Sequence, residues 1–328
     1  MFDVVALGEL LVDFTENGQS QQGNPIFEAN PGGAPCNVLA MLAKLGKRTA
    51  FVGKVGNDFH GAMLKNVAEQ AGIDLRGLAV DPKIPTTLAF VHTAPDGDRD
   101  FSFYRSPGAD CMLTADEVPE DLIQNTRIFH FGTLSLTNEP VREATHKAIA
   151  CAKASGCLIS FDPNLRPPLW NDLTEAKAQI EWGLAQCDIL KIADNEVEFL
   201  TGETDLTKGA QMLRRQFPNI KLFNVTLGPA GSVSYYKDLR VQRPSLGSGK
   251  VIETTGAGDT YCGCVLAYVL DHGIENLSED QLAEMITFAS AAARLVTTRR
   301  GAIRSMPLHR IVRGLFLLAG PLQIGNAK

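Results

Sequence analysis

The feature of the sequence that most limits its fold is a regular alternation of short apolar runs with amphipathic stretches. Buried strands are predicted at residues 4–8, 49–55, 128–132, 158–162, 189–193 and 222–227. Helical patterns lie between them, at residues 34–45, 58–71, 139–154, 175–185 and 205–216. Strands that alternate with helices form a mostly parallel sheet with helices on both faces. We therefore predict one α/β domain over residues 1–328, with ligands bound beyond the carboxyl ends of the strands.

Two segments, residues 14–31 and 86–107, interrupt this alternation. The first is polar and contains no helical pattern. The second contains two alternating segments, 87–92 and 99–105, joined through Pro-Asp-Gly at 95–97, and an Asp-Gly pair in that setting is a strong hairpin signal. Both segments could be solvated loops. We predict instead that together they form a small β-structured lid, which would exclude water from a site beneath it.

Composition and charge narrow the class of protein. The 328 residues are 45% apolar and 21% charged, as in an ordinary globular protein with a large core. The net charge of −6 gives no reason to expect a nucleic-acid or membrane partner. Residues 1–13 lack the features of a signal peptide, and no apolar run approaches the roughly 20 residues of a membrane span. Seven scattered cysteines without a Cys-x-x-Cys pair predict reduced thiols in the cytoplasm.

The candidate active-site motif is Thr-Gly-Ala-Gly-Asp at residues 255–259, followed by an apolar helical pattern at 260–272. Two glycines at the start of a helix allow a tight turn that aims several amides at one point. The positive end of the helix dipole also favours phosphate there. Asp259, in the first helical turn, could take the proton from an attacking hydroxyl. A simple helix cap is the other interpretation of this aspartate.

Two other nucleotide-binding motifs are absent from the sequence. The Gly-Lys pairs at 46–47 and 249–250 lack the upstream glycine of a P-loop. No Gly-x-Gly-x-x-Gly follows the first predicted strand, which argues against a Rossmann dehydrogenase.

Two signatures, in order along the chain, resemble the PfkB family of carbohydrate kinases, which has the ribokinase-like fold. The first is PGGAPCNV at 31–38, continuing to FVGKVGND at 51–58, and the second is TGAGDTYCG at 255–263. The resemblance extends over nearly the whole chain. Within the family it is greatest to fructokinases, in the segments GELLVDF at 8–14 and DPNLRPPLW at 162–170.

The resemblance implies transfer of the γ-phosphoryl group of ATP to the 6-hydroxyl of D-fructose, giving ADP and D-fructose 6-phosphate without a covalent intermediate. Asp259 would be the base, and the amides of Gly256, Ala257 and Gly258 would receive charge that develops on the phosphate. Two alternatives remain: another sugar substrate, above all 2-keto-3-deoxygluconate, or a non-catalytic regulator that binds sugar and nucleotide. The intact motif argues against the regulator. Asp13 argues against a carboxylated sugar, because like charges repel.

For the sugar, the resemblance implies contacts from glycine backbone, two polar side chains and two arginines. Phe101, Phe103 and Arg105 share one face of a predicted lid strand, so closure of the lid would carry Arg105 inward. Arg166 follows a predicted strand, where a cation could hold sugar oxygens or screen the transferring phosphate. The predicted sugar-binding set is Asp13, Gly32, Gly33, Asn37, Arg105 and Arg166.

The resemblance also implies residues for the nucleotide and for cations. The nucleotide set is Asn195, Glu198, Thr226, Gly228 and Gly231. Glu198 would act on Mg²⁺ through water, because Mg²⁺ dehydrates reluctantly. Glu253 stands where many members of the family have an aspartate that helps to bind a monovalent cation, and its longer side chain leaves activation by K⁺ open. The lid further suggests a homodimer, in which the lids of two subunits cover each other.

Overall fold

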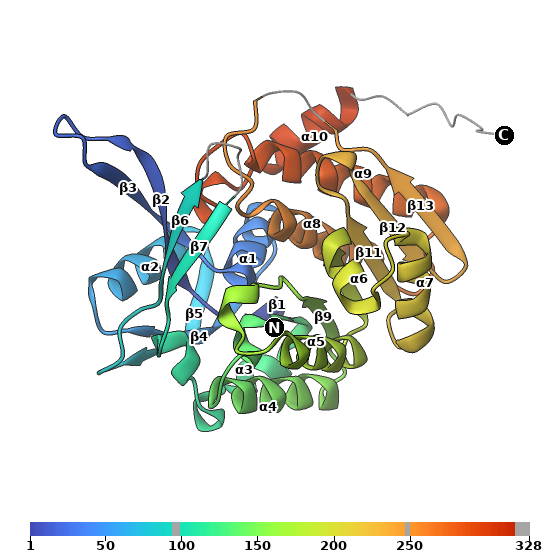
Figure 1. The fold of residues 1–328 in the computed structure, drawn as a ribbon. Helices are drawn as coiled ribbons and strands as arrows, with labels where there is room; N and C mark the ends of the chain where they lie inside the picture. Colours follow the sequence, from blue (N-terminus) through green and yellow to red (C-terminus); the bar gives the residue numbers. More distant parts are fainter. Residues whose placement is uncertain (94–98, 247–249, 319–328) are drawn as a thin grey trace.

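The largest element of the fold is a nine-stranded sheet, in a computed structural model that describes residues 1–93, 99–246 and 250–318 (Figure 1). The strand order is β13-β12-β11-β10-β9-β8-β1-β4-β5. Strands β11 to β5 in this order pair in parallel, whereas β12 and β13 add an antiparallel edge. The bounds are β1 Phe2–Leu7, β4 Thr49–Gly56, β5 Ile73–Asp81, β8 Thr126–Gly132, β9 Leu158–Asp162, β10 Ile189–Ala193, β11 Leu222–Thr226, β12 Ser232–Tyr236 and β13 Leu239–Arg243.

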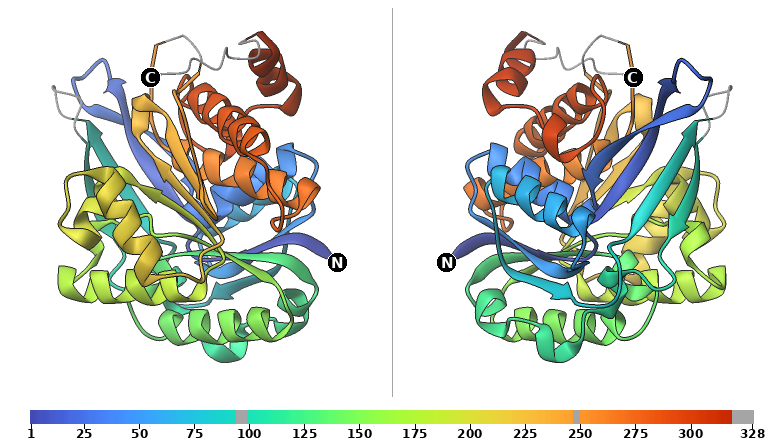
Figure 2. Two further views of the ribbon diagram at one scale, coloured as in Figure 1. Left: turned by 90° about the vertical axis from the view of Figure 1, so that its right-hand side faces the viewer. Right: turned by 90° about the vertical axis from the view of Figure 1, so that its left-hand side faces the viewer.

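Helices cover both faces of this sheet (Figure 2). Within the described residues they are α1 Ala34–Lys44, α2 Phe59–Gln70, α3 Glu120–Gln124, α4 Val141–Ala154, α5 Leu173–Gln186, α6 Asp194–Thr201, α7 Leu206–Gln216, α8 Ala257–His272, α9 Glu279–Val296 and α10 His309–Leu318. In this part of the chain none of them combines the length and the apolarity that crossing a membrane requires.

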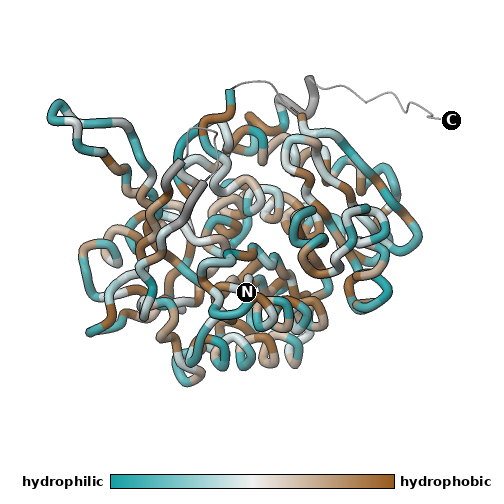
Figure 3. The backbone as a smooth tube through the Cα atoms, in the orientation of Figure 1, coloured by the Kyte–Doolittle hydropathy of each residue, from teal (hydrophilic) through white to brown (hydrophobic). Residues whose placement is uncertain are grey.

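The two-residue period of the strands divides the core into two layers. In β1, Val4 and Ala6 pack with α1, α8 and α9, whereas Val5 and Leu7 pack with α4 and α5 on the other face. Figure 3 shows hydrophobic colouring along the central strands and hydrophilic colouring on outer turns such as the one between β2 and β3. A strand that is buried on both faces reads as a continuous apolar run, which explains why the strands were visible in the sequence.

The six buried strands, the five helices predicted between them and the helical pattern at 260–272 are all present, with small shifts at their ends. The sequence analysis did not predict β5, β12, β13, α3, α6, α9 or α10. Strand β5 is an edge strand with several half-buried residues, so it lacks the continuous apolar run of a central strand. Helix α8 begins at Ala257 and therefore includes the Gly-Asp pair of the candidate motif.

The predicted lid is confirmed as a separate four-stranded sheet of order β3-β2-β6-β7, which Figure 1 shows extending away from the main body. Its strands are β2 Leu11–Gln19, β3 Pro25–Gly32, β6 Leu88–Thr93 and β7 Arg99–Tyr104. Strands β2 and β6 pair in parallel, and the outer pairs are antiparallel. The predicted turn at residues 95–97 lies outside the described residues.

The lid sheet has two different faces. Asp13, Ala89 and Phe103 lie opposite one another on adjacent strands, and Asp13 and Phe103 line a cavity beneath the sheet. The next residues, Phe14 and Phe90, point to the other face, where their rings stack with centroids 4.9 Å apart. The alternation of the strands therefore separates a polar cavity face from an aromatic outer face.

The structure corrects the role predicted for Arg105. Strand β7 ends at Tyr104, so the alternation that places Phe103 on the cavity face no longer applies to the next residue. Arg105 is buried at the base of the lid, where it forms an ion pair of 2.7 Å with Asp110. Its Nη1 donates to Thr137 Oγ1, and the Nη2 of the ion pair also donates to the Leu134 carbonyl, each at 2.8 Å. Arg105 is thus an anchor of the lid and does not line the cavity.

Replacement of Arg105 by methionine tests this structural role. We expect Arg105→Met to lower the free energy of unfolding by about 3–5 kcal/mol, because Asp110 stays buried without its cation. Urea denaturation followed by circular dichroism measures the change.

The matched control is Arg76→Met, which removes a largely exposed pair with Asp74 and should leave the denaturation midpoint close to that of the wild type. An Arg105→Met protein with native stability but weakened ligand binding would return Arg105 to the sugar-binding set.

Candidate active site

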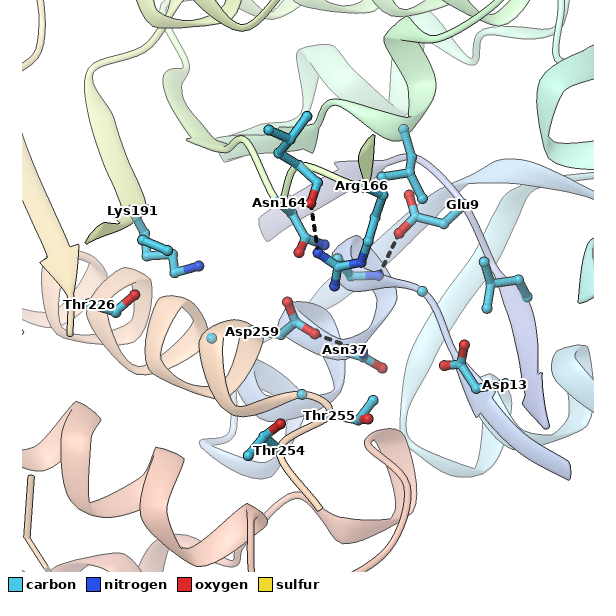
Figure 4. A pocket seen from close by; sticks show the side chains of 18 of the residues that line it. Glu9, Asp13, Asn37, Asn164, Arg166, Lys191, Thr226, Thr254, Thr255 and Asp259 are labelled. Carbon is cyan, nitrogen blue, oxygen red and sulfur yellow. Dashed lines mark hydrogen bonds between the residues drawn. The ribbon is translucent and has the colours of Figure 1, made fainter. Parts of the chain in front are cut away.

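A cavity of about 620 Å³ opens at the carboxyl ends of the parallel strands, beneath the lid. Figure 4 shows the side chains that meet there. Asp13 comes from lid strand β2, Asn37 from α1, Lys191 from β10 and Asp259 from α8. These residues are distant in the sequence, and the sheet topology brings them to one edge.

The first turn of α8 forms the floor of this cavity. Gly256 precedes the helix with a φ of 78°, and a Cβ at this position would lie 2.8 Å from the Cβ of Ala302. Only glycine fits such a turn without strain. The first intrahelical bond runs from the Thr260 amide to the Gly256 carbonyl at 2.8 Å, which leaves the Gly258 and Asp259 amides at the start of the helix without an intrahelical acceptor.

Ala257 differs from the prediction that grouped it with Gly256 and Gly258. Its amide donates to the Thr254 carbonyl at 3.2 Å, and the residue lines a second, adjoining cavity. Gly256 and Gly258 line the main cavity as predicted. Fewer backbone amides are therefore available to this cavity than the three that were predicted from the motif.

Asp259 is buried against the cavity and held by a side chain from another helix. Asn37 Nδ2 donates to its Oδ2 at 2.8 Å. The N-cap position of α8 belongs to Gly256, so the helix-cap interpretation of Asp259 does not apply. Burial raises the pKa of Asp259 above its ordinary value, and the Asn37 hydrogen bond, the Lys191 ammonium and the Arg166 guanidinium oppose that rise. The carboxylate is therefore a stronger base than a solvated aspartate.

Most of the predicted sugar-binding residues surround the same cavity. Asp13, Gly33 and Arg166 line it, and Gly32 packs against the Asp13 carboxylate. Gly33 has a φ of 119° and lies so close to the Glu9 carbonyl that no side chain would fit. Backbone and acidic side chains thus form one wall of the cavity.

Asn37 also offers an open acceptor at this wall. Its Oδ1 is buried and has no hydrogen-bond partner, while its Nδ2 is occupied by Asp259. A buried carbonyl oxygen without a partner is costly unless a ligand or water supplies one. The Asn37 amide is therefore suited to accept a hydrogen bond from a hydroxyl group beside Asp259.

Six cavity residues with polar side chains were not in the predicted site: Glu9, Asn164, Lys191, Asp194, Thr254 and Thr255. Glu9 Oε1 accepts the Ala34 amide at 2.7 Å, and burial raises the pKa of Glu9 to about 7. Asn164 adopts a positive φ of 47°, which is uncommon for a residue with a side chain. Glu9 and Asn164 stood within the segments that resemble fructokinases, whereas Lys191 stood inside an apolar strand that gave no functional signal.

The second cavity, of about 290 Å³, contains the predicted nucleotide residues of the later strands. Thr226 and Gly228 line both cavities, and Gly231 lines the second. Its remaining walls include residues of α8 and α9, among them Tyr261 and Ala293. A largely apolar cavity that shares walls with a polar one suits a ligand with a flat ring and a charged tail.

Asn195 and Glu198, which were predicted to act on the nucleotide and on Mg²⁺ through water, are exposed on α6 and do not line the cavity. The cavity reaches Ala193 and Asp194 at the start of that helix. Glu198 lies four residues beyond Asp194, which is about 6 Å further along the helix axis. The buried acid of this turn is Glu196, which accepts the Ala193 and Leu165 amides.

Glu253 is buried beside the loop that follows α9. Its Oε2 accepts the Gly301 amide at 3.2 Å, so the carboxylate connects two segments that flank the first turn of α8. Within the described residues there is no group of three or more histidine, cysteine, aspartate or glutamate side chains that could hold a metal ion by itself. Any cation at this site would therefore depend on backbone, water or ligand oxygens for most of its contacts.

Comparison with known proteins gives one consistent result. The chain is 42% identical over 306 residues to fructokinase-1 of Zea mays, covering 93% of this chain and 94% of the relative. The crystal structure of fructokinase with bound ATP from Xylella fastidiosa superposes with a TM-score of 0.87 at 28% identity, covering 97% of this chain and 99% of that one.

A second structure carries a sugar, a nucleotide and a cation. It is a double mutant of fructokinase from Vibrio cholerae in a form that binds fructose, ADP and a potassium ion, with a TM-score of 0.86, 30% identity, and coverage of 96% of this chain and 98% of that one. The sequence model of the family described as "pfkB family carbohydrate kinase" matches residues 1–309 of this chain. Because this match spans most of the chain, the protein belongs to the pfkB family of carbohydrate kinases.

Proposed function

We propose that this protein is an ATP-dependent fructokinase, which transfers the γ-phosphoryl group of ATP to the 6-hydroxyl of D-fructose. The observation that carries the proposal is the buried Asp259 carboxylate, held by Asn37 at the phosphate-binding start of α8 and facing a cavity that Asp13 also lines. A base, an anion site and a sugar-sized polar wall thus meet in one place.

The proposed reaction is a direct in-line displacement. The sugar hydroxyl attacks the γ-phosphorus, its proton passes to Asp259, and the bond to ADP breaks as the new bond forms. The Gly256 and Gly258 backbone and the dipole of α8 stabilise the charge that develops on the transferring group. In our proposal Asp13 and Asn37 hold the sugar hydroxyls, and Arg166 holds either a sugar oxygen or a phosphate oxygen.

The nucleotide and Mg²⁺ have a consistent place in this proposal. The charged end of ATP lies in the main cavity, and the base lies in the adjoining apolar one, against Thr226, Gly228 and Gly231. Mg²⁺ keeps several waters and needs few protein ligands. Asp194, which lines the cavity, would hold it together with the phosphates, and the ion would neutralise phosphate charge. For a monovalent cation such as K⁺, Glu253 and the loop at Gly301 are the candidate site.

A panel of sugars tests the substrate and the base together. With ATP and Mg²⁺, we expect ADP release to be fastest with fructose, and Asp259→Ala to lower kcat by about 10²–10⁴-fold, because the hydroxyl loses its proton acceptor. Coupled assays measure turnover, and circular dichroism checks that the variant is folded.

Wild-type turnover in a folded Asp259→Ala protein would contradict the assigned base. Faster turnover of 2-keto-3-deoxygluconate than of fructose would change the substrate and leave the mechanism in place. Nucleotide and sugar binding without any turnover would instead indicate a non-catalytic regulator.

The pH dependence of kcat/KM provides a separate test of Asp259. Only the ionised carboxylate is a base, so activity should fall as pH decreases through a pKa above the usual value of about 3.9. Asn37→Ala removes a hydrogen bond that favours the charged form, so its acid limb should move to higher pH. An acid limb that does not move would contradict this arrangement.

We also propose that the protein forms a homodimer through the aromatic outer face of the lid. Around Phe90, the ring centroids of Phe14, Phe27 and Tyr104 lie at 4.9, 5.5 and 5.4 Å. Tyr104 is nonetheless 66% exposed, and Phe27 on the same face is 38% exposed. An apolar patch of this kind is costly in water and is typical of an interface.

Light scattering after size exclusion tests the dimer. We expect a dimer at micromolar concentration and a monomer for Tyr104→Asp, because the new charge would be buried in the interface. Met212→Asp, an equally simple change of an exposed apolar residue on α7, should leave the mass unchanged. A monomeric wild-type protein would contradict the proposal.

The cytoplasm is the proposed location. All seven cysteines are free, and six of them are buried. Unpaired thiols and the use of ATP both suit a reducing compartment.

A further inference from the structure

Lys191 is a buried cation at the edge of the cavity. It belongs to β10, its side chain is 8% exposed, and it points from the strand toward the first turn of α8 (Figure 4). A Cβ built at Gly258 would lie only 2.9 Å from Lys191 Nζ. The ammonium group therefore lies directly against the residue whose backbone faces the proposed phosphate.

Strand register explains how the lysine reaches this position. Leu190 pairs with Phe161 across β10 and β9, and both residues pack into the core on the α4–α5 side. The next residues, Lys191 and Asp162, are therefore neighbours on the opposite face, where α8 lies. The Lys191 Nζ is 3.1 Å from each oxygen of Asp162. Asp162 orients the ammonium group and leaves its other side toward the cavity.

The surroundings keep Lys191 charged. Burial by itself lowers the pKa of a lysine, but the carboxylates of Asp162, Glu196 and Asp259 more than offset it and raise the pKa of Lys191 above its ordinary value. The same three acids leave this part of the site short of positive charge before any phosphate enters. A fixed cation at that point is what a polyanionic ligand requires.

Lys54 offers a direct comparison within the same chain. It is also buried, but its Nζ contacts both Glu117 oxygens at 2.8 and 2.9 Å and the Met112 carbonyl at 3.1 Å, with Asp81 at 3.5 Å. An ammonium group has three hydrogens to donate, so these protein acceptors satisfy Lys54. Lys191 contacts one carboxylate in the described structure, which leaves donor capacity for a ligand.

We propose that Lys191 is a further catalytic residue of this site, an inference that rests on the proposed kinase activity: its ammonium group donates a hydrogen bond to the γ-phosphoryl group as that group passes Gly258. Lys191 keeps its own proton throughout. The phosphorus–oxygen bond to ADP breaks, the bond to the sugar oxygen forms, and the hydroxyl proton goes to Asp259. Asp162 is a positioning residue, since it acts through the lysine.

The first test is kinetic. We expect Lys191→Met to lower kcat by about 10²–10³-fold, as for the loss of one donor to a developing anion, with a change of less than about threefold in the KM for fructose. Lys54→Met is the matched control, since it should lower the melting temperature and leave kcat within about twofold of wild type. Because Lys191→Met leaves Asp162 buried without its cation, the double variant Lys191→Met/Asp162→Asn is measured as well and should show the same loss of kcat.

The second test does not depend on the sugar. Calorimetry should show that Lys191→Met weakens binding of the non-hydrolysable analogue AMP-PNP about tenfold or more, while ADP binding changes little, because only the analogue carries a γ-phosphoryl group. Equal weakening of both nucleotides, or kcat within threefold of wild type in either Lys191 variant, would overturn the inference. Failure of the wild-type protein to phosphorylate any sugar would contradict the proposed function, and the comparison of the two nucleotides would still decide the role of Lys191.

Discussion

The structure depends on burying several charges together at the first turn of α8. The buried Asp259 carboxylate is stabilised there because Asn37 donates a hydrogen bond to it and because Lys191 and Arg166 balance its charge. Isolated buried charges are strongly unfavourable, so each of these groups constrains the position of the others. Strand β10, the segment after β9, helices α1 and α8 and the glycine turn before α8 must therefore meet within narrow limits. The same limits hold the proposed base beside the proposed anion-binding site.

The alternation of side chains along the lid strands gives the lid sheet two different faces. Successive side chains point to opposite faces, so the strands that place Asp13 and Phe103 over the cavity also place Phe14 and Phe90 outward. The face with Asp13 and Phe103 lies over the proposed sugar site, and the aromatic face is the proposed contact between subunits. A single change of register would exchange the two faces. The buried Arg105–Asp110 pair directly follows β7 at the base of the lid.

Two lysines show how similar environments lead to different roles. Lys54 and Lys191 are both buried in strands of the main sheet, and both are paired with acids. The three acceptor atoms around Lys54 complete its hydrogen bonding within the protein. Lys191 contacts only one acid, Asp162, in the described structure, and its ammonium group remains directed at the cavity. Burial and charge alone therefore do not separate a structural cation from a catalytic one. The two roles are distinguished by the number and direction of the ammonium hydrogens that have no acceptor within the protein.

Local patterns in the sequence were enough for the central strands, six helices, the lid and the glycine–aspartate turn, since each depends on residues close together in the chain. The turn also drew attention to Asp259, whereas Asp13 and Asn37 were predicted only from the family resemblance. Arg105, Glu198 and Lys191 could not be judged in this way. The surroundings of Arg105 depend on where β7 ends, and those of Glu198 depend on where α6 begins. The surroundings of Lys191 depend on the pairing of β9 with β10. Side-chain direction at such points is a property of tertiary contacts, and only the folded chain determines it.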